Sequence, residues 1–336
     1  MAFTVAVAGV TGAVGREMLR TLEQRNFPVA KLLPLASKKS EGMRLPFRGG
    51  EVVVEALGPT SFAGVDFALF SAGTSVSKEF APVAAAAGAV VIDNSSAWRM
   101  DDGCPLVVPE VNPEAAERRP KGIIANPNCS TIQMVVALKP LHDAARLVHV
   151  VVSTYQAASG KGQAAVQDLL AQTRALAEGR VPEATVFPAP LAGNLQSDWK
   201  AGAGDYSEEE WKMVNETRKI MGDATLGVSP TTVRVPVVTG HSESVWLRFS
   251  RAMSAEEAKS LLRRAPGVKL VDAAYAPGNA PQPRDVAGTD DVFVGRVRED
   301  LAVPGALCMW IVADNLRKGA ALNAVQIAEL LAKRRA

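Results

Sequence analysis

The chain has 336 residues, of which 48% are hydrophobic, and its formal net charge is only +2. This length suits two domains with packed cores, and so small a net charge argues against nucleic acid or an anionic membrane as a partner. Three cysteines and three histidines, without metal-ligand spacing, argue against both a disulfide framework and a metal site.

The N-terminal segment predicts a strand that leads into a glycine-rich turn and a helix. Residues 3–8 (FTVAVA) form a β-rich run, and apolar residues recur at helical spacing over residues 14–25. No basic segment precedes a long apolar core, and no stretch approaches the roughly 20 apolar residues of a membrane span. We therefore expect a cytoplasmic protein whose chain opens as a dinucleotide-binding unit.

The predicted elements before residue 126 alternate between strands and helices. Further strands are predicted at residues 31–36, 51–56, 67–71, 89–92 and 121–125, and a helix at residues 81–88. Such alternation is typical of a doubly wound parallel sheet. The predicted fold class is α/β, with a Rossmann-type nucleotide-binding domain.

From residue 129 onward the pattern indicates an α+β domain. Helices are predicted at residues 131–141, 166–178 and 207–221, and strands at 149–157, 232–238, 244–250 and 293–297. The tail, residues 315–333, predicts a strongly amphipathic helix. We expect residues 1–131 and 315–336 to form the nucleotide-binding domain, and residues 132–314 to form a catalytic and dimerisation domain.

The turn after the first predicted strand carries Gly9, Gly12 and Gly15. Glycine lets the backbone turn sharply and approach a pyrophosphate, while the following helix N-terminus offers free N–H groups. The alternative is a tight strand–helix turn that binds nothing. The position directly after an N-terminal strand favours a nucleotide site.

The loop after the second predicted strand contains Ser37, Lys38, Lys39 and Ser40, with no acidic residue before Glu41. An acidic residue in this region would bind the ribose of NAD, whereas cations and hydroxyls suit the 2′-phosphate of NADP. A solvated basic loop is the alternative. We expect NADP as the cofactor.

Cys129 lies in the segment NPNCST, between a predicted strand and a predicted helix. A helix N-terminus lowers the pKa of a thiol, and its N–H groups could also hold an oxyanion. The alternative is a buried structural cysteine, which is the interpretation we give to Cys104 and Cys308. We expect Cys129 to be a nucleophile.

His241 is the candidate partner for this thiol. It follows a predicted strand in a glycine-bearing turn (VVTGHSE), the kind of place where catalytic groups concentrate, whereas His142 and His149 flank ordinary apolar segments. Arg234 lies inside a β-rich run (TTVRVPVV). It is either solvated at an edge or directed at an anion, and its planar fork suits a carboxylate.

Taken together, these residues resemble the aspartate-semialdehyde dehydrogenase family over essentially the whole chain. The resemblance is carried by GVTGAVG at 9–15, DNSSAWRM at 93–100, NPNCST at 126–131, TYQAASGKG at 154–162, EEEWKMVNETRKIM at 208–221, RVPVVTGHSES at 234–244 and ADNLRKGAA at 313–321. The order and spacing of these segments, rather than any one of them, make the resemblance specific.

The resemblance implies that NADPH reduces β-aspartyl phosphate to aspartate semialdehyde and phosphate, in the synthesis of lysine, threonine and methionine. It implies that Cys129 forms a thioester, that His241 is the general acid/base and that Gln156 orients the substrate. It also implies a homodimer formed through the middle domain.

The resemblance further implies a set of binding residues. For the substrate they are Arg234 at the α-carboxylate, Glu209 at the amino group, and Arg99, Lys212 and Asn94 at the phosphate. For the cofactor they are Thr11, Gly12, Ala13, Val14, Ser159, Gly160 and Asn315. Family members often carry arginine near position 39, so Lys39 keeps the charge but not the bidentate fork, and how strongly NAD is excluded stays open.

Three other classes of protein are alternatives to this family. The N-acetyl-glutamyl-phosphate reductases share the nucleotide turn and a cysteine after an Asn-Pro start, but their substrate lacks the ammonium group that Glu209 would meet. A non-catalytic relative would be expected to lack Cys129 or His241, and both are present. A nucleic-acid-binding Rossmann protein does not agree with the charge balance.

Overall fold

The computed structural model describes residues 1–335. The chain divides into two compact units. The first, which we call the nucleotide unit, comprises Met1–Asn128 and the C-terminal segment from Ala320 onward, and the second, which we call the thiol unit, comprises Cys129–Gly319. The predicted boundaries at residues 131 and 315 differ from these by a few residues.

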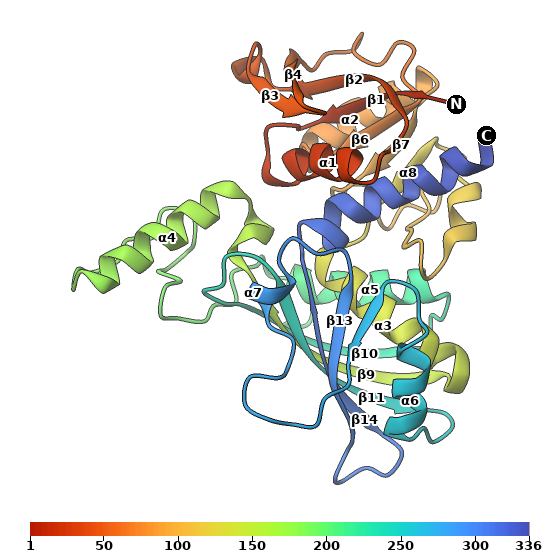
Figure 1. Cartoon of the computed structure of the whole chain (residues 1–336), viewed down its shortest axis with the longest axis vertical. Coiled ribbons are helices and arrows are strands. Elements are labelled where there is room, and N and C mark those ends of the chain that lie inside the picture. The colour runs from red at the N-terminus through yellow and green to blue at the C-terminus, as the bar shows by residue number, and fades with distance from the viewer. Residues whose placement is uncertain (336) are drawn as a thin grey trace. The chain divides into compact units, whose positions relative to one another are not determined.

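The nucleotide unit is built on a six-stranded sheet in the order β5-β2-β1-β6-β7-β8 (Figure 1). The strands are β1 (Phe3–Ala8), β2 (Val29–Ala36), β5 (Glu55–Ala56), β6 (Phe67–Phe70), β7 (Val90–Asp93) and β8 (Ile123–Ala125). The helices are α1 (Ala13–Gln24), α2 (Thr74–Ala86) and α8 (Leu322–Arg335), with short 3-10 turns η1 (Lys38–Ser40) and η2 (Pro113–Glu117). All neighbouring strands pair in parallel, which confirms the predicted doubly wound sheet.

The central strands are apolar throughout because both faces of this sheet are covered. Along β1, Val5 and Val7 pack into the core with α1 and α8, whereas Ala6 and Ala8 pack into the core with α2. Successive strand residues point to opposite faces, so a strand buried on both sides shows no polar alternation.

The tail helix differs from its prediction. Helix α8 begins at Leu322, after a π-helical turn (η4, Arg317–Ala321), and its residues are buried on nearly every side rather than along one stripe. The polar residue Asn323 is accommodated in this core because its amide donates to Val107 O and Asn126 Oδ1. The predicted helix is present, but its predicted strongly amphipathic character is wrong, because the polar residue Asn323 is buried and hydrogen-bonded inside the core.

Two further differences lie in the same unit. The predicted strand at 51–56 is two elements, β4 (Gly50–Val53) and β5, and β4 forms a separate hairpin with β3 (Arg44–Phe47). The hairpin turn uses a positive φ at both Arg48 and Gly49, and arginine gives no sequence signal for such a turn. Helix α2 also begins seven positions earlier than residue 81, at Thr74.

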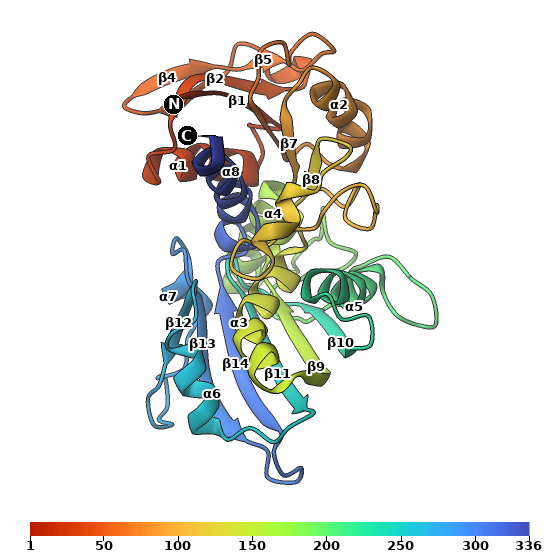
Figure 2. The ribbon, with the colours of Figure 1, turned by 90° about the vertical axis from the view of Figure 1, so that its right-hand side faces the viewer.

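The thiol unit contains a second six-stranded sheet, in the order β10-β9-β11-β14-β13-β12 (Figure 2). The strands are β9 (Leu147–Gln156), β10 (Gly227–Arg234), β11 (His241–Phe249), β12 (Val268–Val271), β13 (Val292–Glu299) and β14 (Leu307–Ala313). The helices are α3 (Cys129–Ala145), α4 (Gln163–Ala177), α5 (Glu208–Met221), α6 (Ala255–Leu262) and α7 (Pro283–Val286), with the 3-10 turn η3 (Ala158–Lys161). The mixed sheet confirms the α+β prediction, although β12, β14 and α6 were not predicted and β10 ends at Arg234 rather than residue 238.

One face of this second sheet is covered by α3, α5 and α6, which contact its strands. The opposite face carries half-buried or exposed side chains that include Val151, Tyr155, Trp246 and Trp310. Helix α4 extends away from the sheet of its own unit (Figure 1). Among residues 1–335, no helix has the length and apolar character needed to traverse a membrane.

Candidate active site

Four strand ends meet at one edge of the sheet in the thiol unit. The parallel strands β9 and β10 end there at Gln156 and Arg234, which are paired in register. Strand β11 runs antiparallel to β9 and therefore begins there, at His241. Strand β14 ends there as well, with Ala313 opposite His241. Candidates that are far apart in the sequence thus come together because of strand direction.

The thiol of Cys129 faces the imidazole of His241. Cys129 is the first residue of α3, and its Sγ lies 3.2 Å from His241 Nε2. On the other side of the ring, the backbone N–H of Ala157 donates to Nδ1 at 3.0 Å. A neutral imidazole that accepts at Nδ1 carries its proton at Nε2, so the Nε2–H points at the sulfur.

His241 is neutral in this arrangement. Complete burial and, to a smaller extent, the positive charge of Arg234 together lower its pKa to about 3, although the nearby carboxylate of Glu209 acts in the opposite direction. The neutral ring donates a hydrogen bond toward Cys129, which favours a thiolate there without an imidazolium.

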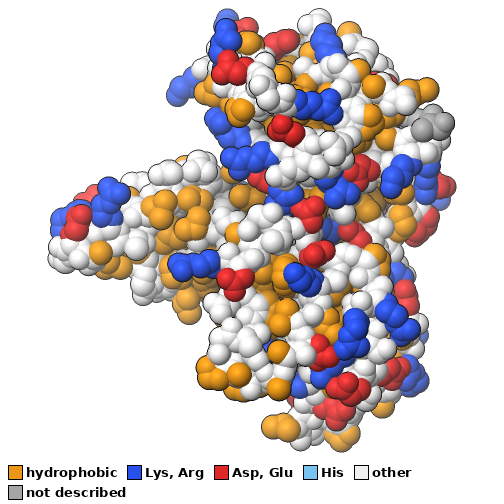
Figure 3. Space-filling view, viewed as in Figure 1, with side chains coloured by type: hydrophobic (Ala, Val, Ile, Leu, Met, Phe, Trp, Pro, Cys, Tyr) orange, Lys and Arg blue, Asp and Glu red, His pale blue; other side chains and the backbone are white. Residues whose placement is uncertain are grey.

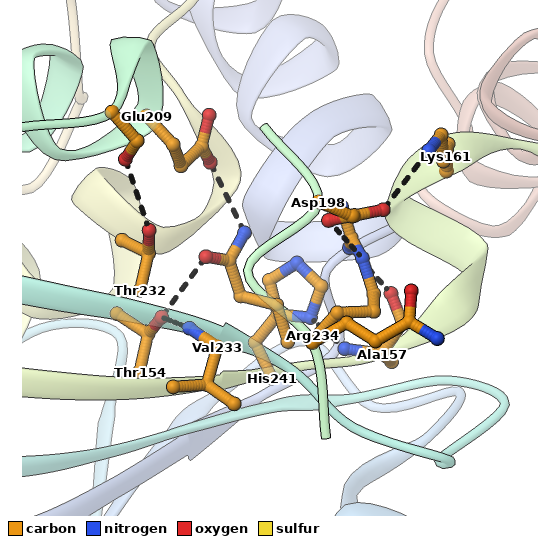
Figure 4. A network of polar contacts seen from close by, with 12 residues as sticks. Thr154, Ala157, Lys161, Asp198, Glu209, Thr232, Val233, Arg234 and His241 are labelled. Atoms are coloured by element: carbon orange, nitrogen blue, oxygen red, sulfur yellow. Dashed lines mark hydrogen bonds and ion pairs between the residues drawn. The ribbon is translucent and has the colours of Figure 1, made fainter. Parts of the chain in front are cut away.

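A hydrogen-bonded chain runs from β9 to α5. Thr154 Oγ1 donates to Gln156 Oε1 at 2.9 Å, Gln156 Nε2 donates to Glu209 Oε1 at 3.1 Å, and Lys212 Nζ lies 3.0 Å from Glu209 Oε2. Figure 4 shows Thr154 and Glu209 in this network. Ser207 caps α5, and its capping box fixes the helix start and so the direction of Glu209. The chain holds the Gln156 amide in one orientation.

Arg234 is buried, with 4% of its surface exposed, so it is not a solvated edge residue. Its Nη1 donates to Ala157 O at 2.9 Å, and its Nε donates to Asp198 Oδ1 at 3.3 Å. Its guanidinium carbon lies 4.8 Å from the centre of the Trp199 ring. These contacts hold the guanidinium beside His241, and Figure 4 shows the two side by side.

Two more residues of the thiol unit, Ser159 and Asn315, hydrogen-bond to each other. Ser159 Oγ donates to Asn315 Oδ1 at 3.1 Å and accepts from Asn315 Nδ2 at 2.9 Å, and the Gly240 N–H also donates to Asn315 Oδ1 at 2.8 Å. Gly160 lies next to this pair, and a Cβ there would come 3.2 Å from both Arg234 Nη1 and His241 Cε1. The segment after β9 therefore packs directly against the reactive groups.

In the nucleotide unit, Asn94 and Arg99 gather at the carboxyl ends of β7 and β8. The buried guanidinium of Arg99 donates to Asn126 O and to Asn94 O, both at 3.0 Å, and Asn126 Nδ2 donates to Asn94 Oδ1 at 2.5 Å. These two backbone carbonyls help to hold the arginine in place.

The glycine turn fits a dinucleotide. A Cβ at Gly9 would lie 2.4 Å from Ser71 O, and one at Gly15 would lie 2.2 Å from Gly9 O, so the tight backbone requires glycine at both positions. Among the described residues no side chain caps the start of α1 at Ala13, and its first turn has no acidic residue. The N–H groups of this first turn therefore remain for an anion such as a pyrophosphate.

The loop expected to read the ribose lies at the carboxyl end of β2, beside β1. Ser37 and Lys39 are exposed and Ser40 is half-buried. Within the part of the chain that the structure describes, neither Lys38 nor Lys39 forms an ion pair. The loop therefore presents two lysine side chains that no described carboxylate pairs with.

Sequence reasoning missed three residues at the sheet edge of the thiol unit. Lys161 and Asp198 form an ion pair at 2.9 Å, and Asp198 also pairs with Arg234. Gly319 packs on the thiol, since a Cβ there would lie 2.9 Å from Cys129 Cβ. Asp198 lies in an irregular segment without periodicity, so no pattern identified it. The small-residue run around Gly319 was the only available signal.

Comparisons with known proteins agree with these observations. Residues 4–119 match the family model "Semialdehyde dehydrogenase, NAD binding domain", and residues 138–318 match "Semialdehyde dehydrogenase, dimerisation domain". The chain is 55% identical to an aspartate-semialdehyde dehydrogenase of Aquifex aeolicus, with 99% of each chain covered, and 51% identical to one of Legionella pneumophila, with 97% of this chain and 95% of that one covered. The crystal structure of aspartate semialdehyde dehydrogenase II complexed with ASA, from Vibrio cholerae, superposes with a TM-score of 0.96 at 47% identity and 99% coverage of both chains.

Proposed function

The chain belongs to the aspartate-semialdehyde dehydrogenase family, and we propose that it reduces β-aspartyl phosphate to aspartate semialdehyde and phosphate through a thioester on Cys129. The product would supply the synthesis of lysine, threonine and methionine. The observation that carries the mechanism is the 3.2 Å approach of Cys129 Sγ to His241 Nε2 at the start of a helix.

In the first step the thiolate of Cys129 attacks the carbonyl carbon of the acyl phosphate. A C–S bond forms, the C–O bond to phosphate breaks, and phosphate leaves with the electron pair. We assign stabilisation of the negative charge on the carbonyl oxygen to the N–H groups at the start of α3 and to the Nε2–H of His241. We assign phosphate binding to Arg99 and Asn94 in the nucleotide unit and to Lys212 in the thiol unit.

For the second step, a nicotinamide cofactor, when bound, would supply the hydride that reduces the thioester. Collapse to the aldehyde would break the C–S bond and return the Cys129 thiolate, and the two electrons of the hydride account for the reduction of the acyl carbon. His241 serves as the acid/base group, and its Nε2–H stabilises the sulfur as its negative charge returns. Gln156, fixed by Thr154, orients the acyl group.

The aspartyl part of the substrate meets two buried charges of the thiol unit. Arg234 offers a planar fork to the α-carboxylate, and Glu209, which is 4% exposed, offers a negative charge to the α-ammonium. An N-acetylated substrate lacks the ammonium group and would leave Glu209 with its Gln156 and Lys212 contacts alone. The site therefore favours a free amino acid over the N-acetyl-glutamyl compound.

We propose NADP as the cofactor, bound by the nucleotide unit. The uncapped N-terminus of α1 and the tight turn at Gly9, Gly12 and Gly15 support pyrophosphate binding. The loop of Ser37, Lys39 and Ser40 supports recognition of a 2′-phosphate. On the thiol unit we assign Ser159, Gly160 and Asn315 to the cofactor. Three cysteines without a disulfide agree with the cytoplasm as the compartment.

We also propose a homodimer through the thiol unit, whose matching family model is named for dimerisation. The sheet face opposite α3 carries Val151 (38% exposed) and the rings of Tyr155 and Trp310, whose centroids lie 5.4 Å apart. Exposed apolar side chains also gather over α4, where Figure 3 shows a hydrophobic patch. An apolar face of this kind is typical of a subunit interface.

A reverse-direction assay tests the proposed reaction. Purified protein is mixed with aspartate semialdehyde, phosphate and NADP, and NADPH formation is followed by absorbance. Controls omit phosphate, replace NADP with NAD, or replace the substrate with N-acetyl-glutamate semialdehyde. We expect phosphate-dependent NADPH formation with the aspartate compound only. Folded, NADP-binding protein that gives no signal would instead support a non-catalytic relative.

A further inference from the structure

Four consecutive residues, Gln196 to Trp199, wrap around Arg234 in the thiol unit, and we call them the Arg234 strap. The backbone of Gln196 pairs with the backbone of Arg234 in both directions, at 3.1 Å and 2.7 Å. The Asp198 carboxylate contacts the guanidinium from one side, and the Trp199 ring lies 4.8 Å from it. Backbone, charge and aromatic contacts from one short segment thus converge on a single side chain, as the close-up in Figure 4 shows for Asp198.

The cluster around Arg234 contains one carboxylate and two cations. The Asp198 side chain is 1% exposed and pairs with Arg234 at 3.3 Å and with Lys161 at 2.9 Å. One carboxylate is therefore shared between two cations, of which Arg234 is the buried one, with 5% of its side chain exposed against 32% for Lys161. Because an unbalanced buried charge attracts a counter-charge strongly, the cluster is suited to receive one further carboxylate.

The hydrogen-bond pattern shows which part of Arg234 is left for that carboxylate. Its Nε donates to Asp198 and its Nη1 donates to Ala157 O. Within the described residues its Nη2 has no hydrogen-bond partner. Asp198 and Ala157 thus occupy the Nε and Nη1 donors of the guanidinium. The Nη2 donors are left for a carboxylate that can accept hydrogen bonds.

We propose that Asp198 is a positioning residue that, with Trp199, fixes Arg234 for recognition of the substrate α-carboxylate. This inference rests on the carboxylate-binding role proposed for Arg234. Without Asp198 the long arginine side chain regains rotamer freedom, and binding must restrict it again. Loss of Asp198 therefore weakens substrate binding while the distance between Cys129 and His241 is unchanged.

The test compares Asp198→Asn with Arg234→Lys, the double variant, and Glu183→Gln as a matched control. Glu183 lies in the same irregular segment, is exposed, and forms no ion pair within the described residues. We expect Asp198→Asn to raise the KM for aspartate semialdehyde about tenfold, the scale of one hydrogen bond to a charged group, with kcat changed less than twofold. The rate of alkylation of Cys129 and NADP binding should match those of the control.

The double variant decides whether Asp198 acts through Arg234. We expect it to be no worse than Arg234→Lys alone, and we expect Asp198→Glu to recover part of the loss. Additive losses in the double variant would overturn the proposal. A lower KM in Asp198→Asn would overturn it as well, because it would show that the Asp198 carboxylate competes with the substrate. Should Asp198→Asn fail to fold, Trp199→Leu keeps the ion pair and must still raise KM.

The variants distinguish failure of the proposed function from failure of the positioning role of Asp198. Parent-like kinetics of Arg234→Lys would remove the arginine from carboxylate binding and with it the proposed substrate contact. If Arg234→Lys is impaired while Asp198→Asn behaves like the control Glu183→Gln, the proposed function stands and only the positioning role of Asp198 is refuted.

Discussion

The glycine turn of the nucleotide unit and the sheet edge of the thiol unit differ in the groups that they offer to a ligand. The turn uses neighbouring residues, 9–15, and offers backbone N–H groups without a charged side chain. The sheet edge gathers side chains such as Cys129, His241 and Arg234 from separate elements, and most of them are buried. A backbone site can thus be recognised in a short sequence, whereas a side-chain site depends on topology.

Removal of the Cys129 thiol should separate the two regions most clearly, because it should affect catalysis at the sheet edge and not cofactor binding at the turn. Cys129→Ala should lower turnover at least about 10⁴-fold, because no other group can form the thioester. NADP binding, which we assign mainly to the turn, should stay within about twofold of the parent when measured by fluorescence titration. A parallel loss of NADP binding would show that Cys129 is structural.

A methyl group in the turn should cost stability. Gly15→Ala places a Cβ 2.2 Å from Gly9 O and 2.7 Å from Val10 Cα, which are backbone atoms that cannot move independently. We expect a loss of about 3 kcal/mol or more in the free energy of unfolding, measured in urea, together with loss of NADP binding. A stable Gly15→Ala variant with normal NADP affinity would contradict the close packing described for this turn.

The same substitution at the sheet edge should affect activity rather than stability. In Gly160→Ala the new Cβ lies 3.2 Å from Arg234 Nη1 and His241 Cε1, which are side-chain atoms that can shift by a few tenths of an ångström. Because small displacements of catalytic groups are costly, we expect kcat/KM to fall about tenfold to hundredfold with unfolding little changed. Steady-state kinetics and urea unfolding of one preparation give both quantities, and a loss of stability without a loss of rate would reverse the expectation.

The smallest effect concerns Glu243, a completely buried carboxyl on β11. Burial, only partly offset by the amide of Gln133, raises its pKa well above the ordinary value. The folded chain therefore keeps a proton that the unfolded chain releases above about pH 4.5, so stability falls as pH rises past that point. Glu243→Gln removes this dependence.

We expect Glu243→Gln to gain about 1–3 kcal/mol over the parent at pH 7.5 and almost nothing at pH 4.5. His241, whose pKa is lowered to about 3, acts in the opposite direction by destabilising the fold as pH falls below about 6.5. It contributes equally to both proteins, so the difference in urea unfolding isolates Glu243. A gain that does not vary with pH would indicate a packing effect instead.

Prediction from the sequence was most complete where the determinants are local. The strand–turn–helix at residues 3–24, the parallel sheet that follows and the helix after Cys129 were all predicted, because periodicity and glycine spacing are properties of neighbouring residues. The resemblance to a family added roles for residues such as Gln156 and Glu209, and the structure places these two within one hydrogen-bonded chain.

Other features depend on contacts between distant parts of the chain. The Nδ1 bond from Ala157 that sets the His241 tautomer joins residues 84 apart, and the Arg234–Asp198 pair joins residues 36 apart. Burial of helix α8 around Asn323 likewise depends on acceptors at Val107 and Asn126.

The sequence by itself therefore determined the two kinds of domain and the glycine turn, because hydrophobic periodicity and backbone requirements act over a few residues, and it also identified Cys129 as the candidate nucleophile. Only the tertiary structure decided which imidazole nitrogen faces Cys129, which carboxylate holds Arg234 and which polar residues are buried. Hydrogen bonds and burial are set by the final packing of the chain, and no spacing along the sequence encodes them.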